Sequence, residues 1–218
     1  MPGFLAVVHA LYADRAELLQ QSAITLYRAA AGFFIALVTM LPLGILLGRV
    51  RVLGDFFEPV IDLLRPLPPL AVLPVVMLFA GAGSHAKIAV VCYGASVPIL
   101  LNAIDGVRNL HPMLHRVSRS LGLHPLQSMF LVDLPAALPH IVSGIRLSMA
   151  VPILIAVSSG MLLSADGLGT FLTRSQESLR IASELGGLVV IAACSLTFNN
   201  VMTALEARLL RWHYARVG

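Results

Sequence analysis

Eight of the polar side chains that interrupt apolar stretches of this sequence are the first candidates for chemistry. They carry hydroxyl or amide groups and fall into three sets: Tyr93, Ser96 and Asn102; Ser158 and Ser159; and Ser195, Asn199 and Asn200. Such a group among apolar neighbours costs free energy unless it finds a hydrogen-bond partner or water. These residues therefore either join helices by hydrogen bonds or line a polar route for a solute.

The residues give little support to enzymatic chemistry. His111 and His115 are four apart, as in a metal pair on one helix face, but no cysteine or carboxylate nearby completes a ligand set. The sequence has no glycine-rich phosphate loop ending in Lys-Ser or Lys-Thr, so the chain cannot hydrolyse ATP itself. It also offers no paired acids and no activated nucleophile. We therefore expect a protein that is not an enzyme and binds no metal or cofactor.

A longer, partly polar segment at about 105–146 separates two strongly apolar stretches. Within it, Leu114, Val117 and Leu121 recur at three- and four-residue spacing, which predicts a short amphipathic helix. Gly122 suits the C-cap of that helix. The positions between the apolar residues are basic or polar: Arg116, Ser118, Arg119 and Ser120. From this pattern alone, the helix either lies on a membrane surface or docks into a partner.

The elements that position these residues belong to a membrane protein. The chain is 58% hydrophobic and 12% charged, with a mean hydropathy of +0.88, whereas a soluble domain carries about 25% charged residues. Its 218 residues suit one compact domain, residues 1–218, at roughly 20 residues per span plus loops. Its basic residues are scattered singly without aromatic interleaving, which argues against a nucleic-acid partner.

Five apolar segments qualify as membrane spans, which predicts an all-α polytopic transmembrane helical bundle. They cover residues 26–47, 68–82, 88–103, 147–163 and 185–205. Gly44 and Gly48 in the first segment have the small-xxx-small spacing that permits close helix contact. Pro98 breaks the third segment, and Pro152 lies in the fourth.

The distribution of Lys and Arg predicts the orientation. If segment 105–146 is cytoplasmic, ten of the 15 basic residues lie on the inner side and five on the outer side, the five being Arg15, Arg28, Lys87, Arg174 and Arg180. This asymmetry follows the positive-inside rule. It predicts a multi-pass protein whose N-terminus is outside and whose C-terminus is cytoplasmic.

From about residue 18 to residue 213, the sequence resembles the permease subunits of binding-protein-dependent ABC importers, in particular the nitrate/sulfonate/taurine group. The most specific match is the cytoplasmic loop signature: Gly122, a spacer of about ten residues, and then Leu134 and Pro135. Because proline restricts the residue before it, Leu134-Pro135 is expected to end the loop and return the chain to the membrane. Other stretches similar to the family are residues 22–33, residues 65–74, Lys87-Ile88 and Gly167-Leu168-Gly169.

The resemblance implies the fold of type I ABC importer permeases and a location in the bacterial inner membrane, in contact with lipid. Two permease copies would form a homodimer and bind two ATPase subunits, which carry the ATP and Mg. A periplasmic or lipid-anchored binding protein would deliver the substrate. The helix at 114–122 would then dock into the ATPase, so that ATP binding switches the spans between inward- and outward-open states.

The implied substrate is a small anion such as a sulfonate, taurine or nitrate. Relatives that carry a vitamin precursor or an aromatic acid by the same mechanism define an alternative. An ATPase-independent channel or secondary transporter is the rival class, although no carboxylate lies deep in any predicted span to support ion coupling.

Three features depart from the family pattern. Family members usually have an additional helix before this region, so the chain either has five spans or lacks an N-terminal helix. The loop motif usually begins Glu-Ala-Ala, whereas this chain has Arg116-Val117-Ser118. Either the partner surface differs, or a carboxylate such as Asp105 or Asp133 compensates. Finally, Gly160 occupies a position near the outer end of the fourth span where the family often has a glutamate.

Overall fold

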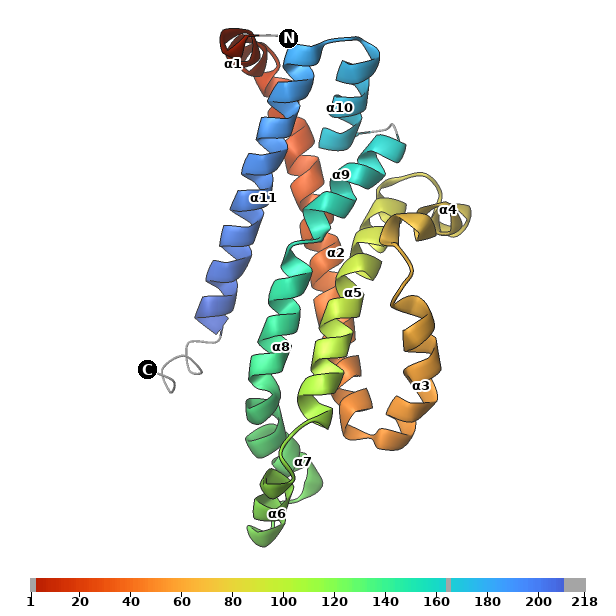
Figure 1. Cartoon of the computed structure of the whole chain (residues 1–218), viewed down its shortest axis with the longest axis vertical. Coiled ribbons are helices and arrows are strands. Elements are labelled where there is room, and N and C mark those ends of the chain that lie inside the picture. Colours follow the sequence, from red (N-terminus) through yellow and green to blue (C-terminus); the bar gives the residue numbers. More distant parts are fainter. Residues whose placement is uncertain (1–2, 164–165, 210–218) are drawn as a thin grey trace.

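The computed structural model describes residues 3–163 and 166–209, and its regular elements are all helices (Figure 1). Four helical stretches are long and apolar enough to cross a membrane: Arg15–Arg49, Ser84–Arg108, Met129–Leu162 and Ile181–Leu205. A fifth span results if α3 (Arg51–Leu64) and α4 (Pro69–Ala80), which bend by 100° relative to each other, form one broken span. The structure therefore confirms the predicted all-α transmembrane bundle.

Three long helices, α2 (Arg15–Arg49), α5 (Ser84–Arg108) and α11 (Ile181–Leu209), and the shorter α8 (Leu134–Met149) form the bundle. Short helices connect them or extend them. These are α1 (Phe4–Ala13), α6 (Pro112–Ser120), α7 (Pro125–Ser128), the π-helical turn η1 (Met129–Asp133), α9 (Pro152–Leu162) and α10 (Leu168–Glu177). In Figure 1, α6 and α7 lie at one end of the molecule, and α1 and α10 lie at the other.

The structure changes two features of the predicted spans, the break in the third and the start of the fourth. α5 continues through Pro98, so the expected break in the third span is wrong. The apolar helical stretch that contains the predicted fourth span begins at Met129, and α8 begins at Leu134. That Leu134-Pro135 ends the cytoplasmic loop stays a prediction. Pro135 lies in the first turn of α8 and follows the π-helical turn η1 without a break, so the helical stretch continues past a residue that has no N–H to donate. The fourth span accordingly starts well before the predicted Leu147.

Glycines bring α2 and α5 into close contact along most of their length. A Cβ atom added at Gly32 would lie 2.6 Å from Val91, and one at Gly48 would lie 2.8 Å from the carbonyl oxygen of Ile104. Contacts therefore advance along both helices together, which means that the two helices run in the same direction. The small-residue spacing of Gly44 and Gly48 is confirmed as a site of close helix packing.

We expect Gly44→Ala to destabilise the protein. The added Cβ would lie 2.6 Å from the Cβ of Ala103 and 2.9 Å from the backbone oxygen of Leu100, so the two helices must move apart. Overpacking of this kind costs about 1–3 kcal/mol. Thermal unfolding in detergent would measure the loss, with Gly83→Ala as the control, since that Cβ would meet nothing within 4 Å. Equal unfolding temperatures for the two variants would contradict the close packing.

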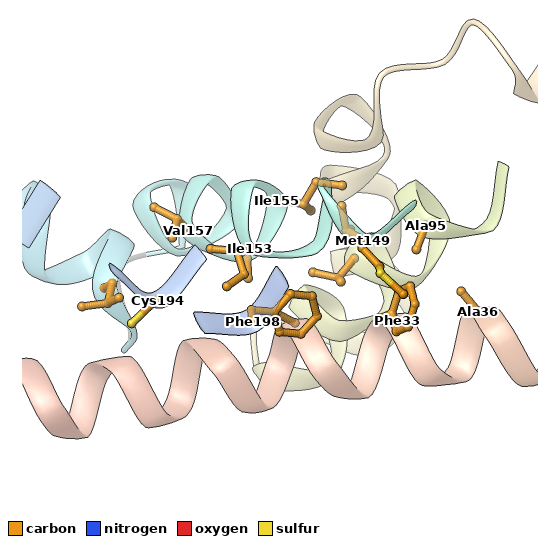
Figure 2. Close-up of a cluster of buried hydrophobic side chains, with 14 of the residues drawn as sticks. Phe33, Ala36, Ala95, Met149, Ile153, Ile155, Val157, Cys194 and Phe198 are labelled. Carbon is orange, nitrogen blue, oxygen red and sulfur yellow. The ribbon is translucent and has the colours of Figure 1, made fainter. Parts of the chain in front are cut away.

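The core lies where α9 and α11 pack on α2 and α5 (Figure 2). Phe33 of α2 and Phe198 of α11 meet edge to face, with ring centroids 6.3 Å apart. Met149 and Ile153 flank the bend between α8 and α9 and are buried in the same cluster. Apolar side chains elsewhere remain exposed, including Leu78 and other large residues of α4, and this surface requires lipid as its solvent.

Four of the five basic residues predicted on the outer side lie at helix starts or in α10: Arg15 begins α2, Lys87 is in the first turn of α5, Arg174 is in α10 and Arg180 precedes α11. The fifth, Arg28, lies further along α2. Arg180, just before α11, donates to both carboxylate oxygens of Asp14 at 2.9 Å, which ties this helix to the junction of α1 and α2. The predicted asymmetry does not map completely onto the two ends of the bundle, because Arg146, which was assigned to the inner side, lies within the apolar stretch Met129–Leu162.

Candidate functional site

The helix predicted at 114–121 is α6, and its two ends are fixed by different groups. At the N-terminus, Nδ1 of His111 accepts a hydrogen bond from the backbone N–H of Met113 at 3.3 Å. At the C-terminus, Gly122 has φ of 65°, and the N–H of Leu123 donates to the carbonyl of Ser118 at 3.1 Å. Together with the Gly122–Arg119 bond, this is a Schellman motif, and the predicted C-cap is confirmed.

His111 therefore caps a helix, and the side chain of His115 lies outside the described part of the structure. Among the described residues, no group of three or more His, Cys, Asp or Glu side chains is placed to hold a metal ion.

One face of α6 is apolar and uncovered. Leu114 is half-buried, whereas Met113, Val117 and Leu121 are exposed. A surface hollow of about 490 Å³ lies along this face, and its lining includes Met113, Arg116, Val117, Ser120 and Leu121. The opposite face points into the protein, where Ser118 is buried. An exposed apolar stripe beside a basic residue is a surface that another protein could cover.

Asp133 cannot compensate for Arg116 on this surface. It is only 1% exposed and forms an ion pair with Arg49, with 3.0 Å between Oδ2 and Nη1. Of the two carboxylates considered from the sequence, only Asp105 is exposed.

Two of the predicted pathway residues lie together. Tyr93 and Ser96 of α5 line a mostly apolar cavity of about 150 Å³ that α2 and α3 complete. The hydroxyl of Tyr93 donates to the carbonyl of Leu64 at 2.7 Å, and the hydroxyl of Ser96 donates to Cys92. Both groups are thus satisfied within the chain.

The structure does not gather the other six pathway candidates into one place. Nδ2 of Asn102 donates to Pro98 at 2.9 Å, and the fully buried Ser159 donates to Ala156. Ser195 donates to the carbonyl four residues earlier in α11. The rest are half-buried or exposed: Ser158, Asn199 and Asn200. A role in a translocation pathway stays a prediction for all eight residues.

The sequence prediction missed a buried group of charges at the other end of the bundle, which we call the Asp166 cluster (Arg28, Lys87 and Asp166). Arg28 is 2% exposed and Lys87 is fully buried. Both form ion pairs with the Asp166 carboxylate and donate to its backbone carbonyl, at 3.0 Å and 3.1 Å. Arg28 also donates to the hydroxyl of Ser84 at 2.7 Å. One carboxylate thereby holds two cations from α2 and α5.

The loop that carries Asp166 is attached to α2 by further hydrogen bonds. The N–H of Gly167 donates to Oε1 of Gln21, and the N–H of Leu168 donates to Oγ1 of Thr25 at 2.9 Å. Gly167 has φ of 101°, which favours glycine. Gln21, Thr25 and Arg28 are spaced four and three apart, so a polar stripe on one face of the first apolar helix was the available sequence signal.

This arrangement of helices is the fold of ABC importer permeases. A chain of the MetNI methionine ABC transporter, in an inward-facing form, superposes with a TM-score of 0.71 at 20% identity and covers 90% of this chain and 96% of its own. A chain of an amino acid ABC transporter, determined with histidines, gives 0.71 at 18% identity, with coverages of 95% and 99%.

The sequence defines the family more closely. Residues 40–212 match the family described as "Binding-protein-dependent transport system inner membrane component", and the chain belongs to this family. It is 32% identical to the taurine transport system permease protein TauC of Escherichia coli K12, over 91% of this chain and 72% of that protein. It is 31% identical to the putative aliphatic sulfonates transport permease protein SsuC of Bacillus subtilis 168, over 93% and 73%. The chain is thus a multi-pass permease subunit of the ABC importer class.

Proposed function

We propose that this chain forms the translocation pathway of an ATP-driven importer for a small anion of the sulfonate, taurine or nitrate kind. Two copies would pair as a homodimer and bind two ATPase subunits, and a separate binding protein would supply the substrate. ATP and Mg belong to the ATPase, and this chain is not itself an enzyme.

The observation that carries the proposal is the uncovered apolar face of α6. This helix lies at one end of the bundle, is held rigid by caps at both termini and presents Met113, Val117 and Leu121 outward. A short, rigid helix with this face suits insertion into a groove of a partner. We therefore assign the ATPase contact to α6 and Gly122.

The segments that flank α6 connect it to the membrane-spanning helices. Upstream, α5 ends at Arg108, and downstream, α7 and η1 continue directly into α8. Because α5 packs on α2 and α8 packs on α5, a displacement of α6 would move three spanning helices. In this proposal, closure of the ATPase on ATP drives the exchange between inward- and outward-open states.

The proposed orientation places the α6 end in the cytoplasm and the Asp166 cluster outside. The basic residues support this assignment through the positive-inside rule. Since α11 runs from the Asp166 end toward the α6 end, the C-terminus would be cytoplasmic (Figure 1).

The substrate class rests on the relatives. Two of them are named for taurine and aliphatic sulfonates, and the Synechocystis protein NrtB, 31% identical over 84% of this chain and 66% of that protein, is named for nitrate import. All three substrates carry an anionic group of oxygen atoms around one central atom. A small oxyanion is therefore the proposed cargo.

Co-purification from native membranes tests the proposal. The tagged chain is expected to bring along an ATPase at about one copy per permease, together with the second permease copy. A tagged, unrelated multi-pass protein of similar abundance is the control. A stable complex without any ATPase would overturn the assignment of α6 and would favour a channel or secondary transporter.

A further inference from the structure

Arginines from four helices surround a cavity of about 400 Å³ at the α6 end of the bundle. They are Arg49 at the end of α2, Arg51 at the start of α3, Arg108 at the end of α5 and Arg119 in α6. The lining also includes the buried Ser118 and Ser128, and none of its described residues is a carboxylate. We call this space the arginine cavity.

Two of the four arginines are fixed by carboxylates outside the cavity lining. Arg49 pairs with the buried Asp133 at 3.0 Å. Arg108 pairs with Asp55 and, at 3.6 Å, with Glu58. Both guanidinium groups are therefore held in place at the wall.

The other two arginines have no ion-pair partner among the described residues. Arg51 and Arg119 are exposed, and within residues 3–163 and 166–209 no carboxylate forms an ion pair with either. Like charges around one space repel each other unless a counter-charge enters it. An anion that enters the cavity would therefore be attracted by the positive charges of Arg51 and Arg119.

The position of the cavity distinguishes it from the proposed ATPase contact. Met113, Arg116, Val117 and Leu121 line the hollow on the apolar face of α6, whereas Ser118 and Arg119 line the arginine cavity. A protein helix needs an apolar groove, and the apolar face supplies it. The arginine cavity supplies guanidinium and hydroxyl groups, which suit a small charged ligand.

We propose that the arginine cavity binds a tetrahedral oxyanion, a phosphate or sulfate group. Guanidinium groups form paired hydrogen bonds with such oxygens, and this geometry is the reason that arginine prevails at phosphate sites. The cavity has room for one such group with several water molecules, each of which takes about 30 Å³. The group belongs either to a free anion or to an anionic lipid, since Arg49 is the last residue of a helix that is long and apolar enough to cross a membrane.

Occupancy has a structural consequence. An anion shared by Arg49, Arg51, Arg108 and Arg119 would connect α6 directly to the ends of α2 and α5 and to the start of α3. The bound state would therefore hold α6 more firmly against the spans than the empty state does. This inference does not rest on the proposed function, because it requires no ATPase.

The test uses the full chain in nanodiscs. In neutral phosphatidylcholine discs, calorimetric titration with inorganic phosphate and with sulfate, at ionic strength fixed by chloride, measures the free-anion arm. In discs that contain phosphatidylglycerol and no added oxyanion, native mass spectrometry measures retained anionic lipid.

The informative variants are Arg51→Gln and Arg119→Gln, because neither change removes the partner of a buried carboxylate. Each is expected to weaken binding by about tenfold or more, since a charge-assisted hydrogen bond is lost. Arg65→Gln is the matched control, as it removes an exposed arginine that directly follows α3 and does not line the cavity. Thermal unfolding without added anion checks that each variant folds.

Saturable phosphate or sulfate binding that the cavity variants weaken supports a free anion. Retention of phosphatidylglycerol alone, weakened by the same variants, supports a lipid headgroup. Binding that is absent in both arms, or unchanged in the cavity variants, overturns the proposal. Loss of a co-purifying ATPase in these variants without any anion binding would also overturn it and would make the cavity a protein contact.

Discussion

Replacing Asp166 by asparagine is expected to destabilise the folded protein by about 2–3 kcal/mol. Arg28 and Lys87 are buried, and both form ion pairs with this carboxylate. Removing one partner of a buried pair costs about 3–5 kcal/mol, because an uncompensated charge stays in the interior. Asp166 itself is 40% exposed, so solvent screening places the expected loss below that range.

The measurement is thermal unfolding of the purified chain in detergent. A loss of this size corresponds to a fall of about 5–10 °C for a protein of this length. Asp62→Asn is the matched control, because Asp62 is well exposed and lies 3.8 Å from Arg65. That variant should unfold within about 2 °C of the wild type, since exposed pairs contribute little. Equal behaviour of the two variants would show that the Asp166 cluster does not hold the loop.

Lowering the pH should reduce the stability that the Asp166 carboxylate contributes. Burial raises the pKa of Asp166, but the Arg28 hydrogen bond and the charges of Arg28 and Lys87 outweigh that effect and hold the pKa below the ordinary value of about 3.8. A carboxylate whose pKa is lowered by folding contributes stability above its unfolded pKa and loses it as the pH falls through the folded value. The difference in the free energy of unfolding between the wild type and Asp166→Asn should therefore decrease below about pH 4.

The Asp166 cluster also shows what the sequence could not supply. Arg28 and Asp166 are 138 positions apart, and a hydropathy pattern contains no information on such pairing. Lys87 was counted as a loop charge near a helix start, whereas it is fully buried. Only tertiary packing distinguishes a solvated cation at the end of a span from one enclosed by neighbouring helices.

Local patterns were more informative where the local backbone decides the structure. The spacing of Leu114, Val117 and Leu121 and the following Gly122 predicted α6 and its C-cap, because a Schellman motif depends on residues within one turn. The break predicted at Pro98 failed for the opposite reason. Neighbouring helices can support a proline inside a span, and such contacts cannot be read from the local sequence.

The two ends of the bundle thus differ in how their charged side chains are arranged. At the Asp166 end, buried cations meet a carboxylate and attach a loop to α2 and α5. At the α6 end, Arg51, Arg116 and Arg119 are exposed beside an uncovered apolar face. The cations at the Asp166 end are paired within the chain. The exposed cations and apolar side chains at the α6 end are the groups that we propose for partner and anion binding.

Gly122→Asp is expected to abolish ATP-driven uptake while leaving the fold and membrane insertion intact. A Cβ at Gly122 would meet nothing within 4 Å, so the new carboxylate would project from the end of α6. The φ of 65° costs a side chain about 1–2 kcal/mol, and aspartate tolerates this region better than most residues do. If α6 docks into the ATPase, the carboxylate must enter the interface without a partner, or meet acidic groups that had matched Arg116.

The variant Gly122→Asn distinguishes the effect of the added charge from the effect of backbone strain, because asparagine has nearly the same size as aspartate and tolerates the same φ. Uptake in proteoliposomes containing the complete importer should fall by about 100-fold or more for the aspartate variant, as expected for about 3 kcal/mol of lost docking energy. The asparagine variant should keep most of its activity and should still co-purify with the ATPase. Wild-type uptake by Gly122→Asp would remove the docking role of α6, and equal inactivity of both variants would assign the effect to the strained backbone at the end of the helix.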